Sequence, residues 1–216
     1  MPSERYSRQQ DIVPAARLAE CRATVVGVGA IGKQVALQLA AIGVPWLQLV
    51  DFDHVEESNL ASQGYLEADL GQAKVDATAK LCRQINGKLA IEIACERFRR
   101  SMTIGNTLFC CVDSVDVRRL IWEATRDSVM FFADGRMSAE VVRVLTACDA
   151  ASRNHYPTTL FAADEAYAGA CTAKTTIFTA NIAAGLMTEQ FTRYLRGFPA
   201  DADVQLNLLT SELTVS

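Results

Sequence analysis

The stretch VVGVGAIGK at residues 25–33 decides the fold. It forms a GxGxxG pattern between a short apolar run at residues 23–26 and an apolar helical pattern over residues 31–43 that ends at a glycine. A glycine-rich turn that leaves a buried strand and enters a helix is the local structure that binds nucleotide phosphates. The stretch therefore predicts a strand, a phosphate-binding turn and a helix in that order.

Each glycine of the turn has its own expected task. Gly27 permits the bend, Gly29 lets a phosphate approach the backbone, and Gly32 lets the helix pack closely against the strand. Free N–H groups at the start of the helix, from Ala30 onward, then face the anion. Taken alone, this pattern fits an NAD or FAD site as well as an ATP site.

The rest of the chain continues the alternation of strands and helices. Strands are expected at residues 46–50, 90–95, 107–112, 130–133, 140–147 and 203–209, and helices at 72–86, 115–126 and 175–195. Three segments lack a regular pattern: an amphipathic lead-in at 1–20, a polar loop at 52–71 and an irregular stretch at 149–172. We expect one domain over residues 1–216, of α/β class, with a Rossmann-like, mostly parallel sheet flanked by helices and antiparallel strands in its C-terminal part.

Composition limits the classes of function. The chain has 216 residues, a net charge of −4 and no Lys/Arg block, so a nucleic-acid partner is not favoured. No apolar run is long enough for a bilayer, and the polar N-terminus lacks the apolar segment of a signal peptide, which predicts no membrane association and a cytoplasmic location. The seven cysteines are odd in number and none are spaced as CxxC, so neither a disulfide framework nor a structural zinc site is expected.

Polar residues after the second expected strand separate the two kinds of nucleotide site. Asp51, at the end of that strand, suits a ribose-binding carboxylate under either reading. A plain NAD fold does not need the polar residues that follow, Asp53, Asn59, Gln63 and Lys74, which are able to surround a triphosphate. Lys74 would place a point charge on the phosphates, and the two amides would bond phosphate oxygens without adding charge. For any one residue alone, a turn cap at Asn59 or a solvated helix position at Lys74 is the simpler interpretation.

Several motifs occur together in one order. They are RYSRQ at 5–9, the glycine turn, DFDHVEESNL at 51–60 with Gln63, GQAK at 71–74, Asp113-Ser114 followed by Arg118, and Cys171-Thr172. Together they resemble the ThiF/MoeB/HesA family of adenylyltransferases, which are similar to ubiquitin-activating enzymes. The resemblance covers most of the chain.

The resemblance implies a reaction and a set of roles. ATP and Mg²⁺ would bind at the carboxyl edge of the sheet, and the C-terminal glycine carboxylate of a ubiquitin-like or sulfur-carrier protein would attack the α-phosphate. Asp113 would hold the magnesium, Ser114 would line the nucleotide site, and Lys74 would neutralise phosphate charge. Arg8 would reach the phosphates of the other subunit of a homodimer. A conjugating enzyme would be a further partner.

Cys171 precedes the expected long helix and belongs to the pair that resembles the thioester-forming Cys-Thr of the family. A cysteine at or just before a helix N-terminus has a lowered pKa, which favours the nucleophilic thiolate. Cys171 is therefore a candidate acceptor of the activated acyl group, giving a thioester. A buried packing role, or adenylation without thioester transfer, stays open.

Two departures from the family pattern keep other functions open. The family usually has an arginine before the glutamine of SNLxRQ, where this chain has Ser62. The CxxC pairs of ThiF and MoeB are also absent. The alternatives are adenylation of a small molecule or a modified tRNA base, a nucleotide-binding scaffold that has lost catalysis and, ranked last, an NAD-dependent oxidoreductase.

Overall fold

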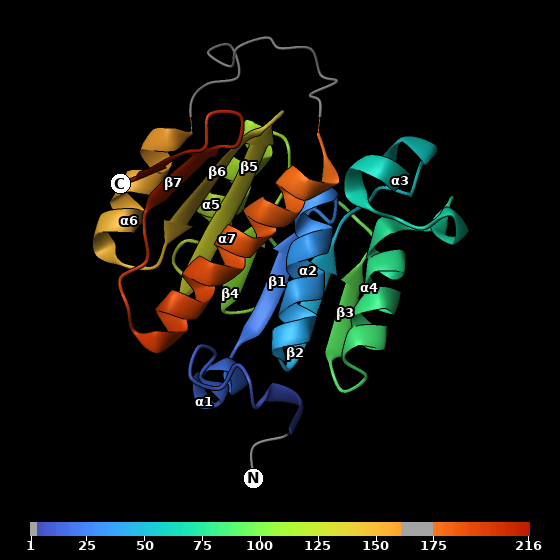
Figure 1. Ribbon diagram of the computed structural model, residues 1–216, viewed down its shortest axis with the longest axis horizontal. Helices are drawn as coiled ribbons and strands as arrows, with labels where there is room; N and C mark the ends of the chain where they lie inside the picture. Colours follow the sequence, from blue (N-terminus) through green and yellow to red (C-terminus); the bar gives the residue numbers. More distant parts are fainter. Residues whose placement is uncertain (1–3, 161–174) are drawn as a thin grey trace.

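The structure is a computed structural model that describes residues 4–160 and 175–216. Its centre is an 8-stranded sheet in the order β3-β2-β1-β4-β5-β6-β7-β8 (Figure 1). The strands are β1 (Arg22–Val26), β2 (Trp46–Val50), β3 (Ala90–Ala94), β4 (Thr107–Cys110), β5 (Phe131–Ser138), β6 (Val141–Ala147), β7 (Asp203–Asn207) and β8 (Glu212–Val215). The pairs from β3 to β5 are parallel and those from β5 to β8 are antiparallel, which confirms the predicted Rossmann-like sheet.

Helices cover both faces of this sheet (Figure 1). On one face lie α2 (Ala30–Ile42), α4 (Lys74–Ile85) and α7 (Ile177–Arg196), and on the other α5 (Val115–Thr125) and α6 (Ala150–His155). The short elements are η1 (Glu4–Tyr6), α1 (Ala15–Ala19), α3 (Glu57–Gln63), η2 (Glu67–Asp69) and η3 (Tyr156–Thr159). Among the described residues, no helix combines the length and the apolar character needed to cross a membrane.

The core explains why the central strands are apolar throughout. All four residues of β4 and the last four residues of β1 and β2 are buried, as expected for strands covered by helices on both faces. One apolar cluster fills the space under α2, α4 and α7, and a second fills the space under α5 and the segment of Tyr156 and Leu160. The sheet is thus a rigid platform between two packed layers.

The strand order sets the position of a ligand site. β1 pairs in parallel with β2 on one side and with β4 on the other, so the chain changes direction across the sheet at β1. A crevice opens outside the carboxyl ends of the strands at such a switch point. The residues that follow β1, β2 and β4 therefore meet at one edge.

Several short elements depart from the sequence-based expectations. The expected loop at 52–71 contains α3 and η2, and the irregular stretch at 149–172 begins with α6 and η3. Both short helices begin with side chains that cap the backbone: Glu56 and Asn59 at α3, and Asp149 and Ser152 at α6. The final strand ends at Asn207 and a further edge strand, β8, follows it, with all of its residues exposed.

Candidate active site

A cavity of about 740 Å³ lies at the carboxyl edge of the sheet, beside the ends of β1, β2 and β4. This volume falls within the range of small-molecule sites. Most of the residues predicted for the site line it: Gly27, Gly29, Ala30, Asp51, Asp53, Gln63, Lys74, Asp113 and Ser114. Arg118, which follows Asp113-Ser114 in the motif quoted above, also lines the cavity. Further walls that the sequence analysis did not assign to the site are formed by Phe52, Arg97, Phe98, Val117 and Leu120.

The three glycines of the turn are required for different reasons. A Cβ atom on Gly27, which has a φ of +84°, would lie 2.8 Å from the Cys111 carbonyl oxygen, and one on Gly32 would lie 1.8 Å from the Gly27 carbonyl oxygen. These two glycines are required by the packing of the chain itself. A Cβ on Gly29 would meet no protein atom closer than the Gln63 Oε1, at 3.8 Å. The space over Gly29 therefore belongs to the cavity, and a ligand is able to approach the backbone there.

The Asp51 carboxylate joins two walls of the cavity. It accepts hydrogen bonds from the backbone N–H of Val28, at 2.7 Å, and from that of Asp53, at 2.9 Å. One side chain thus fixes both the glycine turn after β1 and the loop after β2. An ionised carboxylate has about four acceptor positions, so Asp51 retains capacity for a ribose hydroxyl.

Lys74 forms an ion pair with the loop after β2. Its Nζ lies 3.2 Å from an Asp53 carboxylate oxygen, and its side chain is 8% exposed, compared with 47% for Asp53. Lys74 begins α4, where backbone N–H groups add positive potential. The position suits an ammonium that binds an anion inside the cavity.

The first turn of α2 holds Gln63 against the glycine turn. Lys33 is buried, donates to the Gly64 carbonyl oxygen, and lies with its Nζ 4.6 Å from the centre of the Tyr65 ring. Burial lowers the pKa of the Lys33 ammonium. Gln34 Nε2 donates to the Gln63 carbonyl oxygen at 3.3 Å. Gln63 lines the cavity, and its buried Oε1 has no hydrogen-bond partner within residues 4–160 and 175–216.

Two polar residues of α3 have structural uses. The Asn59 Oδ1 accepts from the Glu56 N–H at 3.1 Å and its Nδ2 donates to the Ser58 Oγ at 3.3 Å, which caps the helix. Asn59 is not among the residues that line the cavity. Ser62 donates to the Ser58 carbonyl oxygen at 2.8 Å, so it turns back on its own helix and contributes no charge to the site.

The segment after β4 presents Asp113 to the cavity. Asp113 is exposed, and Ser114 begins α5 by accepting the Val117 N–H at 3.4 Å. Arg118 donates to the carbonyl oxygens of Val112 and Gly135. Arg118 therefore holds the backbone directly before Asp113 in place.

A buried ionic cluster supports Arg118 from behind. Asp134 on β5 is fully buried and pairs with Arg118 and with Arg136, the latter at 2.8 Å. The Tyr156 hydroxyl donates to the same carboxylate at 2.9 Å. Arg136 also donates to the Thr159 carbonyl oxygen at 2.9 Å. The charged pair Asp134 and Arg136 within an otherwise apolar strand was the available sequence signal, and our sequence reasoning missed it.

Two predicted residues lie apart from the cavity. Arg8 is exposed in the N-terminal segment, which packs near the end of α2: Gln9 Nε2 donates to the Ile42 carbonyl oxygen at 2.7 Å. That end of α2 is at the opposite edge of the sheet, and Arg8 does not line the cavity of its own chain. Cys171 lies outside the described residues. Cys111 does line the cavity, but burial raises the pKa of its thiol, which disfavours the thiolate.

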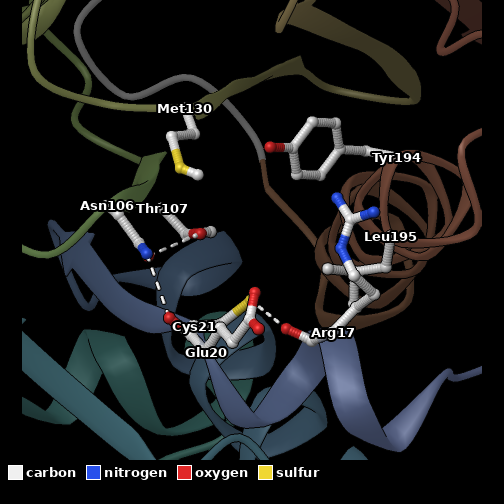
Figure 2. Close-up of a pocket in the computed structure, with 8 residues that line it drawn as sticks. All are labelled: Arg17, Glu20, Cys21, Asn106, Thr107, Met130, Tyr194 and Leu195. Atoms are coloured by element: carbon white, nitrogen blue, oxygen red, sulfur yellow. Dashed lines mark hydrogen bonds between the residues drawn. The ribbon is translucent and has the colours of Figure 1, made fainter.

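A second, much smaller hollow lies at the amino ends of β1 and β4 (Figure 2). Its volume is about 30 Å³, room for about one water molecule. Its edges are tied by hydrogen bonds from Cys21 Sγ to the Arg17 carbonyl oxygen and from Asn106 Nδ2 to the Glu20 carbonyl oxygen. None of its lining residues lines the larger cavity.

Curated relatives match parts of the chain. It is 43% identical over 76 residues to "Adenylyltransferase and sulfurtransferase MOCS3-1" of Zea mays, which covers 35% of this chain and 16% of that protein. It is 38% identical over 136 residues to "Adenylyltransferase and sulfurtransferase MOCS3" of Bos taurus, which covers 56% of this chain and 29% of that protein. The matches thus span less than a third of either relative.

Solved structures and a family description match nearly the whole chain. PaaA aligns with a TM-score of 0.78 and 20% identity over 99% of this chain and 82% of its own. E. coli MccB, crystallised with ATP, aligns with a TM-score of 0.79 and 13% identity over 100% of this chain and 72% of its own. At these identities the likeness shows the fold. The sequence model of the ThiF family matches residues 6–214, and the chain belongs to that family.

Proposed function

We propose that this protein uses ATP to adenylate a carboxylate. The observation that carries the proposal is the space over Gly29, which opens into a cavity also lined by Lys74 and Asp113. A backbone that a phosphate is able to approach, one ammonium and one exposed carboxylate are the groups that phosphoryl-transfer sites use. The relatives named as adenylyltransferases support the same reaction.

ATP would lie across the carboxyl edge of the sheet. The phosphates would meet the N–H groups at the start of α2, and Asp51 would accept a hydrogen bond from the ribose. A carboxylate oxygen of the substrate forms a bond to the α-phosphorus while the bond from that phosphorus to the bridging oxygen breaks, and pyrophosphate leaves. Lys74 would neutralise charge on the phosphates, and the Gln63 Nε2 would donate a hydrogen bond to a phosphate oxygen. Catalysis then comes from position and charge.

Magnesium fits the site through Asp113. An exposed carboxylate facing the phosphates is the usual protein ligand of this ion, which takes its other ligands from water and phosphate oxygens. Bound magnesium would supply charge neutralisation to the leaving pyrophosphate. Arg118 would keep Asp113 in place by holding the Val112 carbonyl.

The substrate we favour is the C-terminal glycine of a ubiquitin-like or sulfur-carrier protein. The Bos taurus relative is named as an adenylyltransferase and sulfurtransferase, and E. coli MccB was crystallised with MccA. We further propose a cytoplasmic homodimer of single-domain chains in which Arg8 serves the other subunit's site. Acyl transfer to Cys171 as a thioester, and onward to a conjugating enzyme, completes the proposal.

One observation favours a second candidate, a nucleotide-binding scaffold. Ser62 occupies the position of a family arginine and its hydroxyl bonds its own helix, so one phosphate-binding cation is missing. Such a protein would bind ATP without turning it over.

Exchange of labelled pyrophosphate into ATP tests the proposal. We expect exchange only when a small protein ending in Gly-Gly, or another carboxylate substrate, is present. Asp113→Ala should abolish exchange, while Asp116→Ala, an exposed change in the first turn of α5, should leave it intact. ATP binding without exchange for every candidate substrate would favour the scaffold.

A further inference from the structure

Arg97 and Phe52 form a stacked pair at the mouth of the cavity. The Arg97 guanidinium carbon lies 3.8 Å from the centre of the Phe52 ring, and both side chains line the cavity. Phe52 directly follows Asp51 after β2, and Arg97 lies in the segment after β3. The pair therefore links the segment that follows β2 to the segment that follows β3.

The cavity has two chemically different ends. Gly29, Gln63 and Lys74 lie on the side of the sheet covered by α2 and α4. Phe98 and Val117 pack with the cluster under α5 on the opposite side, where the cavity wall is apolar. A nucleotide with its phosphates at the first end would extend its base toward the second, and the ring of a purine suits an apolar wall.

Arg97 differs from the other cations around the site in having uncommitted donors. Lys74 pairs with Asp53, and Arg118 pairs with Asp134. In the part of the chain that the structure describes, the stacking contact with Phe52 is the one interaction found for Arg97. Its neighbours in the chain are committed elsewhere: Arg99 pairs with Glu96, and Arg100 pairs with Glu123 at 2.8 Å.

We propose that Arg97, whose guanidinium lies over the Phe52 ring, binds the base of the nucleotide by stacking on it. Arginine stacks on aromatic rings because its guanidinium is planar, delocalised and weakly hydrated. Phe52 keeps that plane in place before the ligand arrives, so little side-chain entropy is lost on binding. Arg97 would then increase the affinity for AMP and for ATP by the same factor, because the two nucleotides share the base and differ only in their phosphates. This inference rests on the proposed ATP site.

Binding measured by calorimetry separates contact with the base from contact with the phosphates. The probes are ATP, AMP and tripolyphosphate, and the variants are Arg97→Ala, Arg97→Lys and, as a control, Arg100→Ala, whose side chain pairs with Glu123 and does not line the cavity. For Arg97→Ala, we expect the dissociation constants of ATP and AMP to rise by one common factor, between about threefold and thirtyfold. Tripolyphosphate binding should not change. Lysine keeps the charge but lacks the plane, so Arg97→Lys should restore little of the loss.

Three outcomes would overturn the inference. If Arg97→Ala weakens the binding of ATP and tripolyphosphate but not of AMP, and Arg97→Lys restores the affinity, Arg97 is a phosphate ligand in place of the absent family arginine. Equal affinities in wild type and Arg97→Ala would make it a rim residue, while the ATP site itself would stand. If the wild-type chain binds neither ATP nor AMP, the proposed function fails and the inference fails with it.

Discussion

At Gly29 a substitution should change ligand binding without changing the stability of the fold. An alanine methyl there would meet no protein atom within 3.8 Å. The free energy of unfolding of Gly29→Ala should therefore lie within about 1 kcal/mol of the wild-type value, while its affinity for ATP should fall at least about tenfold. Gly27→Ala is the matched contrast. Its positive φ and the 2.8 Å approach to Cys111 should cost about 1–3 kcal/mol of stability. Denaturant unfolding and ATP titration measure both, and unchanged ATP affinity in Gly29→Ala would contradict the site.

The sequence predicts the location of a residue in the fold where the course of the backbone alone decides it. Gly29, Asp51 and Asp113 each follow a parallel strand, and the carboxyl ends of those strands must meet at one edge. Asn59 shows the limit of that reasoning. Its amide serves the start of α3 as a cap, and a cap and a phosphate ligand share the same residue types. Arg97 carried no motif, because its stacking on Phe52 depends on the fold.

At the scale of elements, β5 is joined to α5 through buried charge. The carboxylate of Asp134 balances Arg118 and Arg136, whose side chains are 6% and 14% exposed. Asp134→Asn would leave two buried guanidiniums without a carboxylate, so we expect a loss of about 3–5 kcal/mol in the free energy of unfolding. Urea unfolding measures it.

The control for that variant is an ion pair on the protein surface, between Arg126 and Asp127, whose side chain is 92% exposed. Asp127→Asn should lower the free energy of unfolding by less than about 1 kcal/mol. A similarly small loss for Asp134→Asn would show that the buried cluster does not stabilise the junction of β5 and α5.

Elements that bury apolar residues were predicted from sequence, and elements that bury almost none were not. The burial of β1, β2 and β4 on both faces gives uninterrupted apolar runs, and α7 has an apolar pattern that ends at Gly197. By contrast, α3 has one buried residue and depends on its capping side chains, while β8 has none and depends on pairing with β7. Hydrophobic periodicity does not detect elements that bury so little.

For the whole molecule, Asp203 links stability to pH. It bonds Arg143 of β6 at 2.6 Å and lies 3.3 Å from His155 of α6. Burial raises the pKa of Asp203, but the hydrogen bonds and charges of Arg143 and His155 together outweigh it, and the net pKa lies below the ordinary 3.8. The folded state therefore binds fewer protons than the unfolded state near that pH. The stabilisation is complete above the ordinary pKa and is lost as pH falls through the lower, folded one.

Asp203→Asn removes this dependence. The difference in unfolding free energy between wild type and variant should shrink as pH falls below about 4. Denaturant melts across this range measure it, with Asp127→Asn as an exposed control. A difference that stays constant down to pH 3 would show that Asp203 has no lowered pKa in the folded state.

The nucleotide products of a reaction with a carboxylate substrate distinguish attack at the α-phosphorus from hydrolysis at the γ-phosphorus. If the cavity directs attack at the α-phosphorus, chromatography of a single turnover with ATP and a small protein ending in Gly-Gly will show pyrophosphate and AMP bound to that protein. Asp113→Ala will form neither product. Formation of ADP and phosphate by the wild-type protein, with the carboxylate unmodified, would show that the cavity does not direct attack at the α-phosphorus.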